Sequence, residues 1–378
     1  MKTIIIACIG IAQSMFTIFL LSRRKVIKVA DNVLSVWLTG LCLLFILDII
    51  KVYRQVTEML WPISTSVSLT FPPLLYLYTK YIIKEHERFD KKDLRHFTPS
   101  ILAIIIFAIL YSTEISNLLS YIEFYDSLTL LRSIIGNALI ISLWVYVVLT
   151  LFRLYQYKKQ IVNSYSFESA KISLNWLLFL TIFYLIFFHI IVLVSYLQIK
   201  KITVVYIEAI GSVLSLLIIY ILSYCGLKQQ QLSYEKGLPL IIQKPETYIP
   251  DENRYTKSGL KDNAANEYLK QLITFMEESE PWKDAELSVA KLSKLTGIPK
   301  HYITQILNEY LHKNFYTFIN EYRTEYAMKL IISPKYQNWS FVAIAYESGF
   351  NSKTAFNNFF KKYTNLTPSE YKKQNLGL

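Results

Sequence analysis

Residues 341–371 read FVAIAYESGFNSKTAFNNFFKKYTNLTPSEY, and this stretch decides the fold of the last third of the chain. Its apolar residues recur at the spacing of amphipathic helices, with one interruption at Gly349. A glycine permits the left-handed backbone that a tight turn between two helices needs. Ser352 follows as a candidate N-cap. The pattern predicts a helix-turn-helix unit at about 340–363, whose core is Phe341, Ala345, Phe350, Phe356 and Phe360.

A second copy of this helix-turn-helix pattern lies earlier in the chain, at 287–307, and reads LSVAKLSKLTGIPKHYITQIL. Gly297 supplies its turn, and we expect a helix-turn-helix unit at about 287–310. The predicted helix 315–332 joins the two units and is about 27 Å long. Such a rod suits two recognition helices placed about 34 Å apart, one turn of DNA. The inner face of the first unit is predicted to be Val289, Leu292, Leu295, Ile298, Ile303 and Ile306.

The spacing from Phe341 to Tyr371 resembles the signature of the AraC/XylS-type transcriptional regulators. The matching positions are Phe341, Ala345, Gly349, Phe350, Phe356, Phe360, Lys361, Lys362, Thr367, Pro368 and Tyr371. The resemblance covers about 260–373 and implies a bacterial double helix-turn-helix domain that binds double-stranded promoter DNA, commonly as a homodimer. RNA polymerase is a further candidate partner. Two departures are Asn365, where the family usually has Gly, and Asn358, where it often has Arg; Asn tolerates a left-handed backbone better than most residues.

Polar residues on the outer faces of the two second helices are the candidates for DNA contact. Gln and Asn can pair bidentately with adenine, and Lys can donate to guanine. The base-contact candidates, which match base-reading positions of the resembled family, are His301, Thr304, Gln305, Lys353, Thr354, Asn357 and Asn358. The phosphate-contact candidates, which would position the domain without reading sequence, are Lys300, Lys313, Arg323, Lys361 and Lys362.

The composition divides the chain into two unlike halves. Hydrophobic residues make up 53% of the 378 residues and charged residues 18%, against about 25% charged in a typical soluble domain. Disorder is excluded by this apolar content, and three cysteines exclude a disulfide scaffold. Residues 1–227 hold 32 charged residues, whereas 228–378 hold 36 in a much shorter stretch. The first half therefore has the composition of a membrane domain.

Seven apolar runs in the first half have roughly the length needed to cross a bilayer, about 20 residues. The third contains Pro72 and Pro73, which predict a break in its helix. Lys and Arg are concentrated in the loops after the first, third and fifth runs, so the positive-inside rule places the N-terminus outside and the C-terminus in the cytoplasm. The runs are 3–21, 33–52, 62–83, 97–111, 133–152, 174–197 and 203–222.

Ionisable residues inside these runs are candidates for a signal site, because burying them in lipid is costly. Asp48, His189 and Glu208 are the three candidates. The alternatives are that Asp48 and Glu208 reach the interface and that His189 makes an ordinary interhelical hydrogen bond. The ligand, a small molecule or a membrane signal, is not identified by the sequence.

Motifs of enzymes and metal sites are absent from the sequence. It has no phosphate-binding loop, dinucleotide fingerprint, H-E-x-x-H or C-x-x-C, so we expect no catalytic residue, metal or cofactor. The cluster Glu85–His96 contains metal-capable side chains, but five basic residues surround them, and we interpret it as a solvated loop. Residues 228–261 are polar and contain three prolines, which predicts a linker with a reach of about 30–35 Å if flexible.

Taken together, the sequence predicts an all-α protein: a seven-helix transmembrane sensor at 1–227, a cytoplasmic linker at 228–261 and an AraC-type DNA-binding domain at 262–378. We expect a one-component transcriptional regulator in the bacterial inner membrane. Two alternatives stay open. One is a receptor or transporter whose C-terminal domain binds protein, and the other is a membrane enzyme with a regulatory tail.

Overall fold

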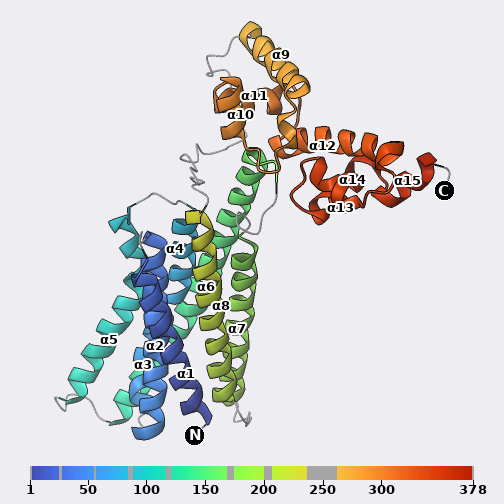
Figure 1. Cartoon of the computed structure of the whole chain (residues 1–378). Coiled ribbons are helices and arrows are strands. Elements are labelled where there is room, and N and C mark those ends of the chain that lie inside the picture. The colour runs from blue at the N-terminus through green and yellow to red at the C-terminus, as the bar shows by residue number, and fades with distance from the viewer. Residues whose placement is uncertain are drawn as a thin grey trace. The chain divides into compact units, whose positions relative to one another are not determined.

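The computed structural model describes residues 2–24, 28–54, 57–83, 88–115, 121–167, 174–199, 207–235 and 262–376. In these ranges the regular structure is helical, apart from one antiparallel bridge between Tyr165 and Ser288. The chain forms two compact units, coloured along the sequence in Figure 1. The first consists of Met1–Tyr155 with Leu174–Lys244, and the second of Gln156–Ser173 with Pro245–Leu378. Thus a short segment from the apolar half of the sequence belongs to the same unit as the C-terminal helices.

The first unit is built from apolar helices that coincide with the predicted runs. They are α1 (Lys2–Ser22), α2 (Val29–Arg54), α3 (Thr57–Ser68), α4 (Phe71–Ile83), α5 (Thr98–Ile115), α6 (Tyr121–Ser164), α7 (Asn175–Ile199) and α8 (Ile207–Glu235), with a short 3-10 helix, η1 (Lys91–Phe97). The end of α6, from Gln156 onward, belongs to the second unit. Within the described residues, four helical stretches are long and apolar enough to cross a membrane. They are Thr3–Ser22, Val29–Lys51, Ser133–Ser164 and Ile210–Lys228. The structure therefore supports a membrane domain but does not show seven spans.

The predicted break in the third run is confirmed. Helix α3 ends at Ser68 and α4 begins at Phe71, so the prolines fall in the first turn of α4. A proline is tolerated there because the first N–H groups of a helix have no partner within the helix.

Helix α6 extends well past the end of the predicted span at Phe152. It has 44 residues and is therefore about 66 Å long, against about 30 Å of bilayer hydrocarbon. The additional residues, 153–164, read RLYQYKKQIVNS and contain neither Gly nor Pro to end the helix. The hydropathy pattern thus predicted the apolar part of this helix, 133–152, but not its continuation to Ser164.

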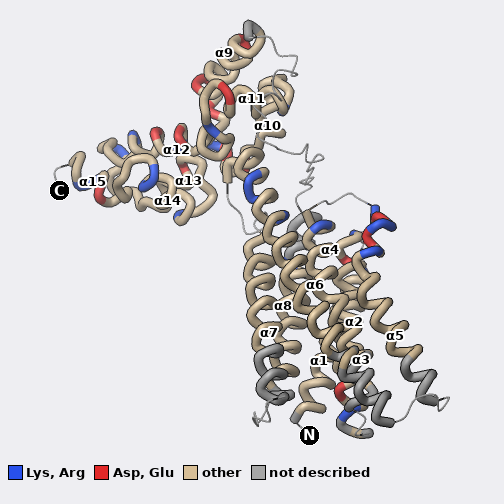
Figure 2. Tube along the Cα trace, turned by 180° about the vertical axis from the view of Figure 1, so that it is seen from behind, with Lys and Arg blue, Asp and Glu red and all other residues tan. Residues whose placement is uncertain are grey.

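Apolar and aromatic contacts hold the first unit together. Helix α1 packs on α2 and α8, and α2 also packs on α4. Trp37 of α2 is fully buried, with its ring edge-to-face against Tyr184 of α7. A polar contact joins α1 to α8, where the Thr17 hydroxyl donates to Ser223 Oγ at 2.8 Å. Figure 2 shows few charges along the middle of these helices and a group of both basic and acidic residues near α4 and α5.

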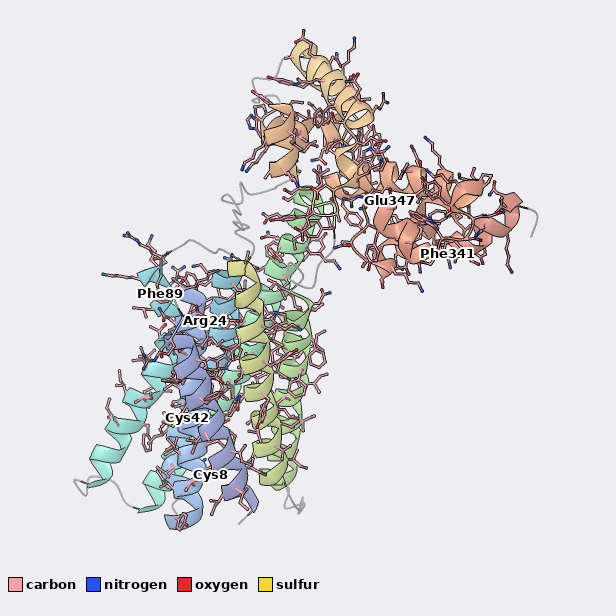
Figure 3. The ribbon with its side chains drawn as sticks, viewed as in Figure 1. Cys8, Arg24, Cys42, Phe89, Phe341 and Glu347 are labelled. Carbon is pink, nitrogen blue, oxygen red and sulfur yellow. The ribbon has the colours of Figure 1, made fainter. Side chains whose placement is uncertain are left out.

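The second unit contains the two predicted helix-turn-helix pairs. The first pair is α10 (Val289–Thr296) with α11 (Lys300–Glu309), and the second is α13 (Phe341–Glu347, the ends labelled in Figure 3) with α14 (Lys353–Thr364). Helix α12 (Phe315–Ile332) lies between them in sequence and contributes to both hydrophobic cores. The remaining elements are α9 (Asp262–Glu278), η3 (Pro281–Lys283), η4 (Pro334–Tyr336) and α15 (Pro368–Leu376).

Local sequence explains where these helices begin and end. Ser352 caps α14 by accepting from Ala355 N at 3.1 Å, as predicted, and Ser288 caps α10 in the same way. Gly297 (φ 75°) and Gly349 (φ 82°) have left-handed backbones. Asn365 ends α14 with φ 61°, so it takes the role for which the resembled family usually has glycine.

The Thr367-Pro368 part of the signature forms a capping box at the start of α15. The Glu370 carboxylate accepts from the Thr367 N–H and hydroxyl, each at 2.7 Å, and Glu370 N donates back to Thr367 Oγ1 at 3.3 Å. Hydrogen bonds from the backbone and hydroxyl of Thr367 lower the pKa of Glu370. Reciprocal bonds of this kind satisfy helix N–H groups that lack helical partners.

Gly349 and Gly297 provide a matched pair for testing the turns. A Cβ on Gly349 would collide with the Trp282 carbonyl and lie 2.9 Å from the Lys283 carbonyl oxygen, whereas one on Gly297 meets nothing within 4 Å. Gly297→Ala should cost about 1–2 kcal/mol of unfolding free energy for the left-handed backbone. Gly349→Ala should cost about 1–3 kcal/mol more because of the clash. Pulse proteolysis of the full chain in detergent across a urea series measures both, and equal costs would contradict the close approach.

Candidate nucleic-acid interface

Helix α11 presents a narrower polar surface than its sequence suggested. Lys300 and His301, in its first turn, are exposed. Thr304 is half-buried, and its hydroxyl donates to the Lys300 carbonyl at 3.0 Å. These three side chains form the outer face of the first recognition helix.

Gln305 is not on that face. It is only 8% exposed, and its amide donates to Glu309 Oε2 at 2.9 Å. Helix α11 packs against α9, α10 and α12, so its buried surface extends further round the helix than Ile303 and Ile306 alone implied. The predicted base contact by Gln305 does not fit this arrangement.

Helix α14 has the two-sided character that was expected of a recognition helix. Its inner face is buried, with Phe356 and Phe360 fully inaccessible. On the outer side Lys353, Thr354 and Asn358 are exposed, and Asn357 is half-exposed. All four predicted base-contact residues of this helix are thus accessible to a ligand.

The five predicted phosphate contacts have three different environments. Lys300, Lys361 and Lys362 are exposed. Lys313 forms an ion pair with Glu321 at 2.6 Å, which offsets its charge. Arg323 is 1% exposed and lies in the interior, so a phosphate cannot reach it in this arrangement. Burial lowers the pKa of Arg323 to about 10, which leaves it charged at neutral pH.

The predicted signal residues of the membrane half make local contacts. Asp48 pairs with Lys51 of the same helix at 3.2 Å. His189 is exposed, and its Nδ1 lies 2.7 Å from the Leu185 carbonyl of its own helix, with the ring edge-to-face against Trp144. The predicted interhelical hydrogen bond of His189 is therefore replaced by an intrahelical one. Glu208 is in α8, and its side chain is outside the described residues.

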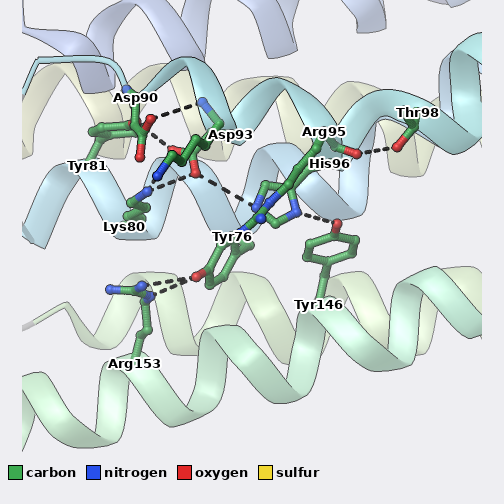
Figure 4. A network of polar contacts seen from close by, with 11 residues as sticks. Tyr76, Lys80, Tyr81, Asp90, Asp93, Arg95, His96, Thr98, Tyr146 and Arg153 are labelled. Carbon is green, nitrogen blue, oxygen red and sulfur yellow. Dashed lines mark hydrogen bonds and ion pairs between the residues drawn. The ribbon is translucent and has the colours of Figure 1, made fainter. Parts of the chain in front are cut away.

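A polar network at η1, drawn in Figure 4, was missed at the sequence level. Asp93 is buried and bonds to Lys80 Nζ at 2.7 Å and the Tyr81 hydroxyl at 2.6 Å. His96 Nδ1 lies 2.8 Å from the Tyr146 hydroxyl. The interpretation of this loop as solvated was therefore wrong for Asp93, while residues 84–87 lie outside the described ranges. No group of three metal-capable side chains is assembled in the part of the chain that the structure describes.

The geometry defines a class of protein: a domain with two helix-turn-helix pairs, in a chain whose described residues also include four helical stretches long and apolar enough to cross a membrane. Residues 292–374 match the model of a helix-turn-helix domain family. The C-terminal part of the chain is accordingly an AraC-type helix-turn-helix domain.

Curated relatives are similar to part of the chain. An uncharacterized HTH-type transcriptional regulator of Staphylococcus aureus (strain COL) is 28% identical over 146 residues, which cover 39% of this chain and 18% of the relative. Regulators of the same description from strains MSSA476 and N315 match with the same identity and coverage. The chain thus spans under one fifth of the length of these relatives. A solved protein of unknown function from Listeria innocua is 24% identical, with 28% of this chain and 95% of that protein covered and a TM-score of 0.25.

Lys361 and Lys313 allow the phosphate contacts to be tested against a control. Lys361→Gln should weaken DNA binding and reduce the slope of log K against log salt concentration by about 0.9, the value for one lost phosphate contact. Lys313→Gln should leave the slope unchanged because Glu321 already neutralises the lysine. Fluorescence anisotropy over a salt series measures both slopes. An unchanged slope for Lys361→Gln would remove it from the interface.

Proposed function

We propose that this chain is a membrane-embedded one-component transcriptional regulator that binds promoter DNA through both helix-turn-helix pairs. The observation that carries the proposal is the pair of helices α11 and α14, each buried on one face and polar on the other, within the matched family region. Recognition helices of this kind enter the major groove, where side chains reach base edges.

In the proposed complex α14 contributes most of the base reading. Lys353, Thr354, Asn357 and Asn358 are accessible there, whereas α11 offers Lys300, His301 and Thr304. Lysine can donate to guanine and asparagine can pair with adenine. Lys361 and Lys362 would hold the phosphate backbone. From Ala285 onward the chain has 12 basic and 6 acidic residues, an excess that favours a polyanionic partner.

The membrane arrangement that we propose has seven spans, with the N-terminus outside and the DNA-binding domain in the cytoplasm. Four long apolar helices support membrane insertion, and the Lys and Arg of η1 support a cytoplasmic position for that loop. The signal would enter through the first unit, and regulation would involve homodimerisation and RNA polymerase. Relatives described as transcriptional regulators favour this reading over an enzyme or a protein-binding tail.

A double variant tests the base contacts. Lys353→Ala with Asn357→Ala should lose about 1–3 kcal/mol of binding free energy per contact on the cognate site. Binding to unrelated DNA should change much less. Lys335→Ala with Asn338→Ala, two exposed residues near η4, is the matched control. The cognate site comes from genome-wide mapping of DNA bound by the full chain, and equal cognate binding by both double variants would contradict the assignment.

A topology reporter tests the orientation on which the function depends. Alkaline phosphatase fused after Gly226 should be inactive, and green fluorescent protein at the same position should fluoresce, because we expect this end of α8 in the cytoplasm. The opposite pair of results would place the DNA-binding domain outside the cell and overturn the proposed function.

A further inference from the structure

Arg323 is a buried cation with every donor used. A guanidinium has five N–H groups, and five hydrogen bonds are formed here. Nε donates to the Trp282 carbonyl at 2.8 Å. Nη1 donates to the Ser166 carbonyl at 2.9 Å and Asn320 Oδ1 at 3.0 Å. Nη2 donates to the Asp284 carbonyl at 2.7 Å and Ser166 Oγ at 3.0 Å.

Two of those five acceptors belong to Ser166, a residue from the loop that follows α6. Ser166 is 1% exposed. Its carbonyl also accepts from Asn320 Nδ2 at 3.1 Å, and its N–H and hydroxyl donate to the Leu287 carbonyl at 3.2 and 2.7 Å. All polar groups of this one serine are thereby bonded to residues of the C-terminal domain.

The neighbours of Ser166 extend the contact. Tyr165 forms an antiparallel bridge with Ser288, the residue that caps α10. Phe167 is buried at 6% exposure, with its ring edge-to-face against Tyr165. The three residues Tyr165–Phe167, which we call the clip, thus reach the start of the first helix-turn-helix pair and the middle of α12.

The Arg323 site is completed only by the clip. An unpaired N–H on a buried charged group is costly, and Arg323 has no carboxylate among its hydrogen-bond partners, only carbonyl, amide and hydroxyl oxygens. Without Ser166 two donors would lose their acceptors. The guanidinium carbon also lies 5.9 Å from the Phe350 ring, next to the turn that precedes α14. Arg323 therefore links the clip to the loop of η3, to α12 and to the turn of the second helix-turn-helix pair.

We propose that the clip is a docking segment, that the Arg323–Asn320–Leu287 site is its receptor, and that this contact carries the signal from α6 to the recognition helices. The regulatory part rests on the proposed function, whereas the docking part does not. Helix α6 runs without interruption from Tyr121 to Ser164 and leads directly into the clip. A continuous helix transmits movement along its length, so the input would arrive through α6.

A disulfide tests the docking. Tyr165 and Ser288 form a non-hydrogen-bonded antiparallel pair, for which the Cα–Cα distance is about 4.5 Å, within the range that a disulfide spans. The full chain should have Cys8, Cys42 and Cys225 replaced by Ser, a protease site inserted within 236–261, and Tyr165→Cys with Ser288→Cys. After oxidation in lipid nanodiscs and cleavage, the two fragments should remain joined until reduced.

Tyr165→Cys with Lys373→Cys is the control and should not join them. Failure of the first pair to crosslink, or crosslinks formed only between chains, would overturn docking within one chain.

Retention of the cleaved fragment tests the energetic role of Ser166 without a crosslink. With an affinity tag at the N-terminus, the C-terminal fragment of the otherwise native chain should co-elute after cleavage. Ser166 is 1% exposed, so the larger leucine side chain of Ser166→Leu does not fit, and the substitution also removes the hydroxyl. The amount of C-terminal fragment that co-elutes should therefore fall about tenfold or more. Ser164→Leu is the control. Ser164 does not bond to Arg323, so this variant should retain as much fragment as the native chain. Equal retention for the two variants would refute the site.

DNA affinity separates the regulatory part from the docking part. In the uncleaved chain Ser166→Leu should lower affinity for the mapped promoter about tenfold at fixed salt, and Ser164→Leu should not. An unchanged affinity would overturn signal transfer through the clip. A failure of all variants and of the native chain to bind DNA would instead overturn the proposed function, since the crosslink and retention measurements contain no DNA.

Discussion

A single buried guanidinium organises the second unit. Removing a charge from water costs several kcal/mol unless its hydrogen bonds are replaced. Arg323 obtains all five replacements from four residues in three parts of the chain: Ser166 after α6, Trp282 and Asp284 in the loop of η3, and Asn320 in α12. The same carbonyl that accepts from Nε, that of Trp282, lies against Gly349. The loop of η3, helix α12 and the turn before α14 are therefore positioned together, and a larger residue at Gly349 or a missing acceptor at Ser166 would disturb all three.

This constraint ties a segment from the apolar half of the sequence to the C-terminal helices. The residues that complete the Arg323 site follow α6, a helix whose middle, 133–152, is apolar and whose last 12 residues include Arg153, Lys158 and Lys159. Under the proposed role of the clip, a change in α6 would reach α12 through Ser166 and the start of α10 through Tyr165.

The sequence predicted those parts of the fold that depend on local patterns. The turns at Gly297 and Gly349, the cap at Ser352 and the left-handed Asn365 follow from backbone chemistry within a few residues. The helix break before Pro72 also follows from local backbone chemistry. The burial of Arg323 and Gln305 could not be predicted this way, because it results from packing between segments far apart in the sequence. No sequence pattern marked Ser166, because a serine in a loop between two apolar runs has no distinguishing neighbours.

The most direct test of the account is a hydroxyl-radical footprint of the full chain in lipid nanodiscs on a mapped promoter. The account predicts two protected segments on one face of the duplex, with centres about 10–10.5 base pairs apart for each bound chain, and loss of the segment read by α14 in the Lys353→Ala, Asn357→Ala variant. Protection of one segment only, or protection that does not depend on sequence, would contradict a regulator that reads DNA with both helix-turn-helix pairs.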